Sequence, residues 1–215
     1  MRRAGFPVPG LLLAVFALAA QQPEATPVVG WYNGEWQSGI PGLANWYLGP
    51  NRFARVYDEF EVPAGGWTVV GVFSDNGLYG FPPVTHAAWE IRRGMRPRHG
   101  GKIVAKGVSP ATQRPDPSVT PPRYPADEAA KHFRIQVGGL RVTLPPGRYW
   151  LSVAPVGNGQ SYISATRGTN AVGAPLSTAL VGKSGGKSFS PAGQQSSKGE
   201  AGTGRHFAQG VIAAK

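Results

Sequence analysis

Glycine and proline constrain this chain most strongly, because they occupy 31 and 21 of its 215 positions. In a helix interior glycine costs about 1 kcal/mol and proline about 3 kcal/mol relative to alanine, so this density disfavours a helical bundle. Turns must therefore be frequent. Hydrophobic residues still make up 41% of the chain, which is enough apolar side chain to build one folded core.

The first twenty residues have the pattern of a secretory signal peptide. Two arginines follow Met1, and a run of apolar residues, LLLAVFALAA, occupies 11–20. This run is too short to cross a bilayer as a helix, which takes about 20 residues. We therefore expect residues 1–20 to be removed and the mature chain to be periplasmic or secreted, without a transmembrane segment.

The cysteine content excludes several kinds of site, and the net charge indicates which partners to expect. The chain has no cysteine, so disulfides, thiolate metal sites and cysteine nucleophiles are excluded. The formal net charge is +11, and about +9 remains without Arg2 and Arg3. A cationic exported protein attracts polyanions through forces that salt weakens, so polysaccharides or anionic cell-surface polymers are the expected partners. Export argues against a specific nucleic-acid partner.

Alternation of apolar and polar residues indicates short strands along most of the chain. The segments with this pattern are 56–62, 67–73, 87–92, 102–106, 133–137, 140–144, 149–153 and 161–166. Glycine and proline clusters separate most of them, and Asp75, Asn76 and Gly77 are predicted to form a tight turn. Because the mature chain shows no helical period, we predict an all-β fold, an antiparallel two-sheet β-sandwich of jelly-roll-like type.

Composition divides the mature chain into three parts. Residues 28–175 contain most of the predicted strands and form the β-sandwich body. Residues 176–204 are rich in Gly, Ser and Lys with a single acid, which is typical of a flexible loop. Alternation resumes over 205–215, so the chain is expected to return to the sheet as a final strand. A disordered tail is the alternative.

Four segments resemble exported bacterial β-sandwich proteins, many of which have PEP-CTERM-type sorting tails. These segments are YDEF at 57–60 with a predicted hairpin into Trp67, AWEIR at 88–92, PGRYWLSVAP at 146–155 and NAVG at 170–173. The resemblance implies a non-enzymatic extracytoplasmic domain. The chain lacks the sorting tail of these proteins, so sorting by that route is not expected.

The densest group of carboxylates is Asp58, Glu59 and Glu61. Alternation places Asp58 on the same face as Phe60 and Val62, where a charge without a partner is costly. Three interpretations stay open. Asp58 has an ion pair or hydrogen bonds, or acts as a catalytic acid, or belongs to a structural Ca²⁺ site.

The Ca²⁺ site would combine oxygens of Asp58 with those of the Asp75-Asn76 turn or of Asn51. No other cofactor is predicted. As a catalytic acid in a glycosidase, Asp58 or Glu61 would need a second carboxylate at a defined separation. The candidates for that second group are Glu35, Glu90 and Asp75.

Aromatic side chains are the candidate ligand-binding residues. Trp36, Trp46 and Tyr47 lie in a Gly-rich segment near the start of the mature chain, and exposed flat rings stack on the C–H faces of sugars. Trp67 and Trp89 are instead expected in the core. We therefore expect a non-catalytic protein of the cell envelope or extracellular matrix with a binding or structural role, with glycans as the favoured ligand. A polysaccharide-active hydrolase with paired carboxylates is the alternative.

Overall fold

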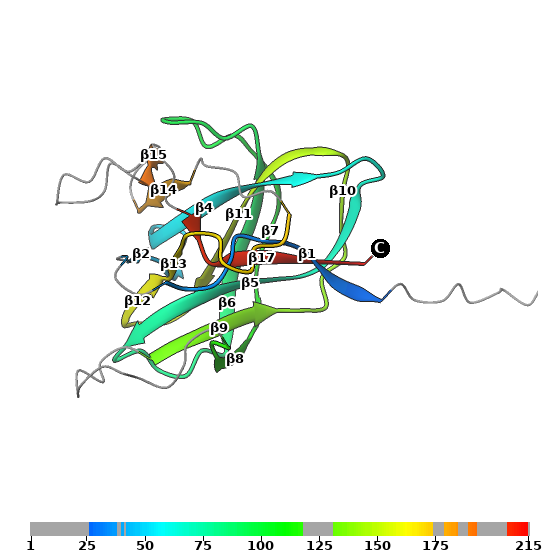
Figure 1. The fold of residues 1–215 in the computed structure, drawn as a ribbon. Helices are drawn as coiled ribbons and strands as arrows, with labels where there is room; N and C mark the ends of the chain where they lie inside the picture. Colours follow the sequence, from blue (N-terminus) through cyan, green and yellow to red (C-terminus); the bar gives the residue numbers. More distant parts are fainter. Residues whose placement is uncertain are drawn as a thin grey trace, which may run out of the picture.

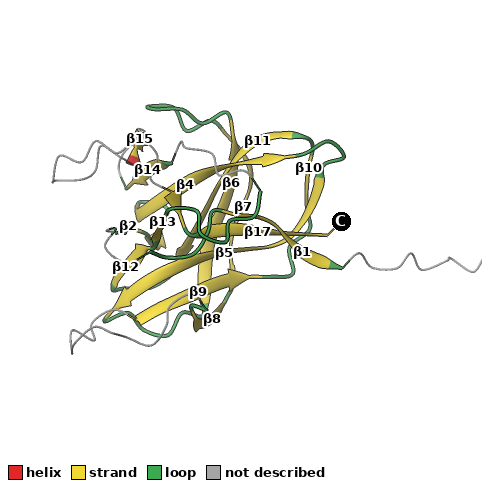
Figure 2. Ribbon diagram, in the orientation of Figure 1, coloured by secondary structure: helices red, strands yellow, loops and turns green. Residues whose placement is uncertain are grey.

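The computed structural model of the chain describes residues 26–37, 40, 42–117, 131–173, 179–184, 189–192 and 206–214. Residues 1–20, the predicted signal peptide, lie outside this part of the chain. Within it, no helix is long and apolar enough to span a membrane. Strands account for almost all of its regular structure (Figure 2).

Two antiparallel sheets face each other (Figure 1). The first has eight strands: β1 (Pro27–Tyr32), β2 (Leu43–Ala44), β5 (Trp67–Tyr79), β8 (Thr112–Pro115), β9 (Lys131–Val137), β10 (Val142–Leu144), β12 (Gln160–Ile163) and β17 (Gln209–Ala214). Its main order is β1-β17-β5-β12-β2. Strands β17 and β12 pair with successive parts of one edge of β5, and β10 and β9 pair with the opposite edge. Strand β8 pairs with β9. The long strand β5 therefore organises this sheet.

The second sheet has seven strands: β3 (Trp46–Gly49), β4 (Arg52–Val62), β6 (His86–Arg93), β7 (Lys102–Pro110), β11 (Gly147–Pro155), β14 (Leu180–Lys183) and β15 (Phe189–Pro191). Its order is β15-β14-β4-β11-β6-β7, and β3 also pairs with β4. Two short strands, β13 (Ala165–Thr166) and β16 (His206–Phe207), form a separate pair.

Apolar residues of both sheets form the core between them. The ring of Phe60 in β4 lies 5.2 Å from that of Trp31 in β1 and 6.2 Å from that of Trp67 in β5. It also lies 5.8 Å from the ring of Tyr149 in β11. These contacts join the two sheets, so the predicted antiparallel sandwich is confirmed. Trp67 and Trp89 are both buried, as expected.

The predicted turn at Asp75, Asn76 and Gly77 is wrong, because all three residues lie inside β5. Strand β9 pairs with all three residues along one edge of β5, and β12 pairs with Asn76 and Gly77 along the other. Backbone pairing on both edges outweighs the local turn preference of Asp, Asn and Gly, which is a weaker effect.

The chain also makes no hairpin at Gly65 and Gly66. Strand β4, before these glycines, belongs to the second sheet, whereas β5, after them, belongs to the first. Both glycines have positive φ angles, of 98° and 74°, which glycine adopts at little cost. The turn therefore carries the chain from one sheet to the other, so that Phe60 and Trp67 stack across the core.

Part of the predicted 176–204 loop is strand. Strand β14 pairs with β4, and β15 pairs with β14, so a loop is the wrong prediction for these two segments. Much of the rest of 176–204 lies outside the described residues. The chain then returns through β16 to β17, which pairs with both β1 and β5.

Gly210 in β17 marks a close approach between strands. A Cβ atom added there would lie 2.5 Å from Cζ of Phe73 and 2.7 Å from the carbonyl oxygen of Trp31. We expect Gly210→Ala to lower the free energy of unfolding by about 1–3 kcal/mol, because overpacking displaces its neighbours. Urea unfolding measures the change. Gly138→Ala is the matched control, since a Cβ there meets nothing within 4 Å. Equal losses in the two variants would contradict the close approach.

Candidate functional site

Two open hollows lie next to each other and share the side chain of Tyr162. The first, of about 250 Å³, is lined by Trp46 and Arg52 and is called here the Trp46 hollow. The second, of about 350 Å³, is lined by Trp36 and His132 and is called the Trp36 hollow. Together they form an aromatic surface on one part of the sandwich.

The alternation of β12 presents Tyr162 to this surface. Its neighbours Ser161 and Ile163 are buried, whereas Tyr162 is exposed, as period-two alternation requires. Strand β12 pairs with β5 on one side and with β2 on the other. The three strands meet at the same end of the first sheet (Figure 1), and residues of all three line the two hollows.

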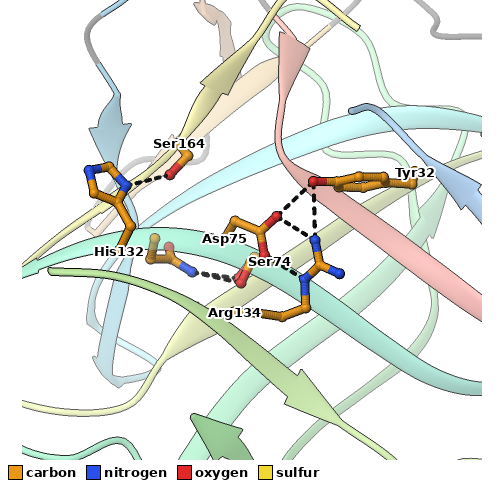
Figure 3. A network of polar contacts seen from close by, with 7 residues as sticks. Tyr32, Ser74, Asp75, His132, Arg134 and Ser164 are labelled. Carbon is orange, nitrogen blue, oxygen red and sulfur yellow. Dashed lines mark hydrogen bonds and ion pairs between the residues drawn. The ribbon is translucent and has the colours of Figure 1, made fainter. Parts of the chain in front are cut away.

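Ring contacts orient the aromatic side chains of the hollows. The rings of Tyr79 and Tyr162 meet edge to face at 5.7 Å, and each side chain keeps more than a third of its surface exposed. The ring of Trp36 lies 4.6 Å from that of His132. Nδ1 of His132 in turn lies 3.4 Å from the Ser164 hydroxyl (Figure 3). These contacts hold the rings in place but leave surface for a ligand.

Of the three predicted glycan-binding residues, two line the hollows and one does not. Trp36 and Trp46 are partly exposed, one in each hollow. Tyr47 lines neither hollow, because alternation along β3 turns it to the opposite side from Trp46. Its ring stacks at 6.4 Å on Phe53 and lies 4.8 Å from the Arg55 guanidinium.

Sequence reasoning missed Tyr79, His132 and Tyr162. They lie on β5, β9 and β12, which are far apart in the chain and become neighbours only through strand pairing. The outward position of Tyr162 follows from the alternation of its strand, so that signal was present. Nothing in the sequence pairs it with Trp36 or Trp46.

Asp58 is fully buried and is held by hydrogen bonds. Its Oδ2 accepts hydrogen bonds from the backbone N–H of Phe207 at 3.1 Å and from the side-chain amide of Gln209 at 3.0 Å. Burial raises the pKa of Asp58 to about 7, although these hydrogen bonds oppose the shift. Of the three interpretations of Asp58, hydrogen bonding is the one for which the structure provides partners.

Asp75 has a different set of partners (Figure 3). Nε and Nη2 of Arg134 donate to its two carboxylate oxygens at 2.7 and 2.8 Å, and the Tyr32 hydroxyl donates at 2.9 Å. Burial raises the pKa of Asp75 to about 6, and the Arg134 guanidinium holds it below the value that burial alone would produce. Burial also raises the pKa of Tyr32, which therefore stays a hydroxyl donor.

Asn76 has a third set of partners. Its Oδ1 accepts a hydrogen bond from Asn45 at 2.9 Å, and its Nδ2 donates to the hydroxyl of Ser74 at 2.8 Å. The described residues contain no group of three or more His, Cys, Asp or Glu side chains that could hold a metal ion. The structure thus gives Asp58, Asp75 and Asn76 separate protein partners, and calcium binding stays a prediction.

Acidic and basic side chains are distributed unequally between interior and surface. The buried acids among the described residues are Asp58, Glu59, Asp75, Glu90 and Asp116. The exposed basic residues in the same part of the chain are Arg52, Arg93, Arg96, Arg98, Lys102, Lys106, Arg114, Arg141, Arg148, Arg167 and Lys183. Glu61 is the one exposed acid among the described residues, and Glu35 is half-buried. The accessible surface of the described residues is therefore more cationic than the composition of the chain indicates.

Neither hollow is lined by a carboxylate. Glu90, a candidate second acid for hydrolysis, is buried with Arg55 at 2.7 Å and Arg92 at 2.6 Å. The other polar side-chain groups at the hollows are amides, hydroxyls, two indole N–H groups, one imidazole and one guanidinium. Burial lowers the pKa of the imidazole of His132, so it is neutral near pH 7.

Fold and site together define an all-β antiparallel sandwich with an aromatic-lined, cationic surface. Comparison of the chain with family models, with curated proteins and with solved structures found no match. The resemblance to exported proteins of the PEP-CTERM-associated type therefore stays a prediction based on the four sequence segments.

Proposed function

We propose that this protein binds glycans at the two hollows, as a non-catalytic protein exported to the cell envelope or extracellular matrix. The observation that supports this proposal is the pair of partly exposed tryptophans, Trp36 and Trp46, which line the two hollows that share Tyr162. Export rests on the signal-like pattern of residues 1–20.

The chemistry of the hollows suits sugars. A pyranose ring presents an apolar C–H face and a rim of hydroxyl groups, so it is bound by an aromatic ring together with a few polar side chains. The Trp46 hollow offers Trp46 and Tyr162 with the amide of Gln160. The Trp36 hollow offers Trp36 with His132, whose neutral imidazole can both donate and accept a hydrogen bond.

The positions of the candidate carboxylates favour glycan binding over the hydrolase alternative. A glycosidase needs two carboxylates about 5–10 Å apart at the bound sugar. Of the candidate acids, Asp58, Asp75 and Glu90 are instead buried against other side chains or backbone groups. Glu35 and Glu61 are not buried, but neither lines a hollow. Binding requires only the aromatic and polar groups that line the hollows.

We expect Trp36→Ala and Trp46→Ala each to weaken glycan binding roughly tenfold, because a stacked aromatic contact contributes about 1.4 kcal/mol. A glycan array first selects a ligand for the full chain, and calorimetry then measures its dissociation constant for each variant. Tyr47→Ala is the matched control, since Tyr47 lies next to Trp46 in sequence but outside both hollows.

Two outcomes would contradict the proposed function. One is the absence of binding across all glycans tested. The other is a loss of binding in Tyr47→Ala that equals the loss in the two tryptophan variants.

Repeating the measurement with a chelator tests the separate expectation of calcium, because a structural Ca²⁺ would make binding or stability sensitive to its removal.

A further inference from the structure

We propose that the glycan contains uronic acid, and that Arg52 binds the carboxylate of a sugar whose ring rests on Trp46 and Tyr162. This inference rests on the proposed function and names the substrate class of the same site. Its basis is an arginine and two aromatic side chains that line one hollow from three different strands.

Arg52 is an exposed cation directed to the Trp46 hollow. It begins β4 and pairs in register with Gly49 of β3, so both strands fix its backbone. Among the described residues, no hydrogen bond or ion pair engages its guanidinium. Other arginines of the sandwich differ, since Arg55 pairs with Glu90 and Arg134 with Asp75.

Charge at the hollow favours an anionic ligand. No Asp or Glu lines the hollow, and the exposed charged residues in the described part of the chain are almost all basic. A guanidinium presents its donors as a planar fork that matches the two oxygens of a carboxylate. A neutral sugar would leave this fork without a partner of its own.

A uronic acid combines the two features that the hollow recognises. Its carboxylate is attached directly to the pyranose ring and leaves the C–H face of that ring available for stacking. A ring on Trp46 or Tyr162 can therefore direct its carboxylate to Arg52 without a linker. Because Tyr162 also lines the Trp36 hollow, the next sugar of a chain has an aromatic contact as well, which favours a polymer over a single sugar.

The test compares acidic oligosaccharides with their own methyl esters, which keep the sugar ring but lose the charge. The probes are oligomers of galacturonate and of mannuronate, and calorimetry on the full chain measures their dissociation constants. At least one acid is expected to bind about tenfold or more tightly than its ester, as a charge-assisted hydrogen bond predicts. Arg52→Gln is expected to remove most of this difference, because it should lower affinity for the acid much more than affinity for the ester.

Two further variants separate recognition from general attraction. Arg52→Lys keeps the charge but loses the fork, so its affinity for the acid should lie between those of wild type and Arg52→Gln. Arg96→Gln removes an exposed cation that lines neither hollow, and it should bind the acid as wild type does. Equal losses in Arg96→Gln and Arg52→Gln would overturn the inference, because attraction would then be diffuse.

The remaining outcomes distinguish this inference from the proposed function. Equal affinity for both acids and their esters, with both lowered by Trp46→Ala, overturns uronate recognition but supports glycan binding. Failure of every glycan to bind overturns both. If inorganic polyphosphate displaces the acids and its binding depends on Arg52, the inference is overturned in favour of a phosphate polymer.

Discussion

Replacing Asp58 by Asn is expected to raise the free energy of unfolding at pH 8 and to leave it nearly unchanged near pH 3. Burial raises the pKa of this carboxyl group from 3.8 to about 7. Between these values the folded protein holds a proton that the unfolded chain has released, so stability falls as pH rises. The total fall is roughly 4 kcal/mol, at about 1.4 kcal/mol per pKa unit. Below pH 3.8 the group is protonated in both states, and above pH 7 it is ionised in both.

Asparagine keeps the shape of Asp58 but does not titrate. Its Oδ1 can still accept hydrogen bonds from Phe207 and Gln209. Urea unfolding of wild type and Asp58→Asn across pH 3–8 measures the difference. Asp75 and His132 titrate in both proteins, so their contributions largely cancel in this difference. A difference that stays constant across the pH range would show that Asp58 does not titrate as predicted.

Arg134→Met is expected to lower the free energy of unfolding by about 3–5 kcal/mol at pH 8, because it leaves the buried Asp75 carboxylate without its counter-charge. The loss should be smaller at pH 5, where Asp75 can take up a proton and needs no partner. Methionine preserves much of the apolar contact, since the Arg134 guanidinium lies 4.3 Å from the ring of Phe73. Urea unfolding at the two pH values tests both statements.

The double variant Arg134→Met with Asp75→Asn identifies the cause of that loss. If an uncompensated charge is responsible, neutralising Asp75 should recover most of the lost stability, because neutral replacements of buried ion pairs are often tolerated. If lost packing is responsible, the double variant will be no more stable than Arg134→Met alone. That second result would contradict the electrostatic explanation.

Local pattern was sufficient to predict much of the fold. The alternation of 56–62 and 149–153 corresponds to β4 and β11, and the tryptophans at 67 and 89 are buried as their alternation indicates. These predictions depend only on neighbouring residues, because a strand directs successive side chains to opposite faces. The same local reasoning failed at Asp75, whose partners are Arg134 of β9 and Tyr32 of β1 rather than its neighbours in the chain.

The candidate site was predicted only in part. Trp36 and Trp46 were singled out from composition and ring chemistry, but neither their separation between two hollows nor the position of Tyr47 outside both hollows could be predicted. Arg52 and Tyr162 were missed because each is an ordinary residue of its own strand. They become a candidate site only where β4 and β12 approach each other.

By itself, the sequence determined that this protein is made of short strands, which of their faces are apolar, and that basic residues outnumber acidic ones. Only the tertiary structure decided which strands are neighbours, that most described acids are buried, and which aromatic rings share a surface. The physical reason is the separation along the chain of the residues that interact. Alternation and glycine content act between adjacent residues, whereas the hydrogen bond from Phe207 to Asp58 joins positions 149 residues apart, and nothing local encodes it.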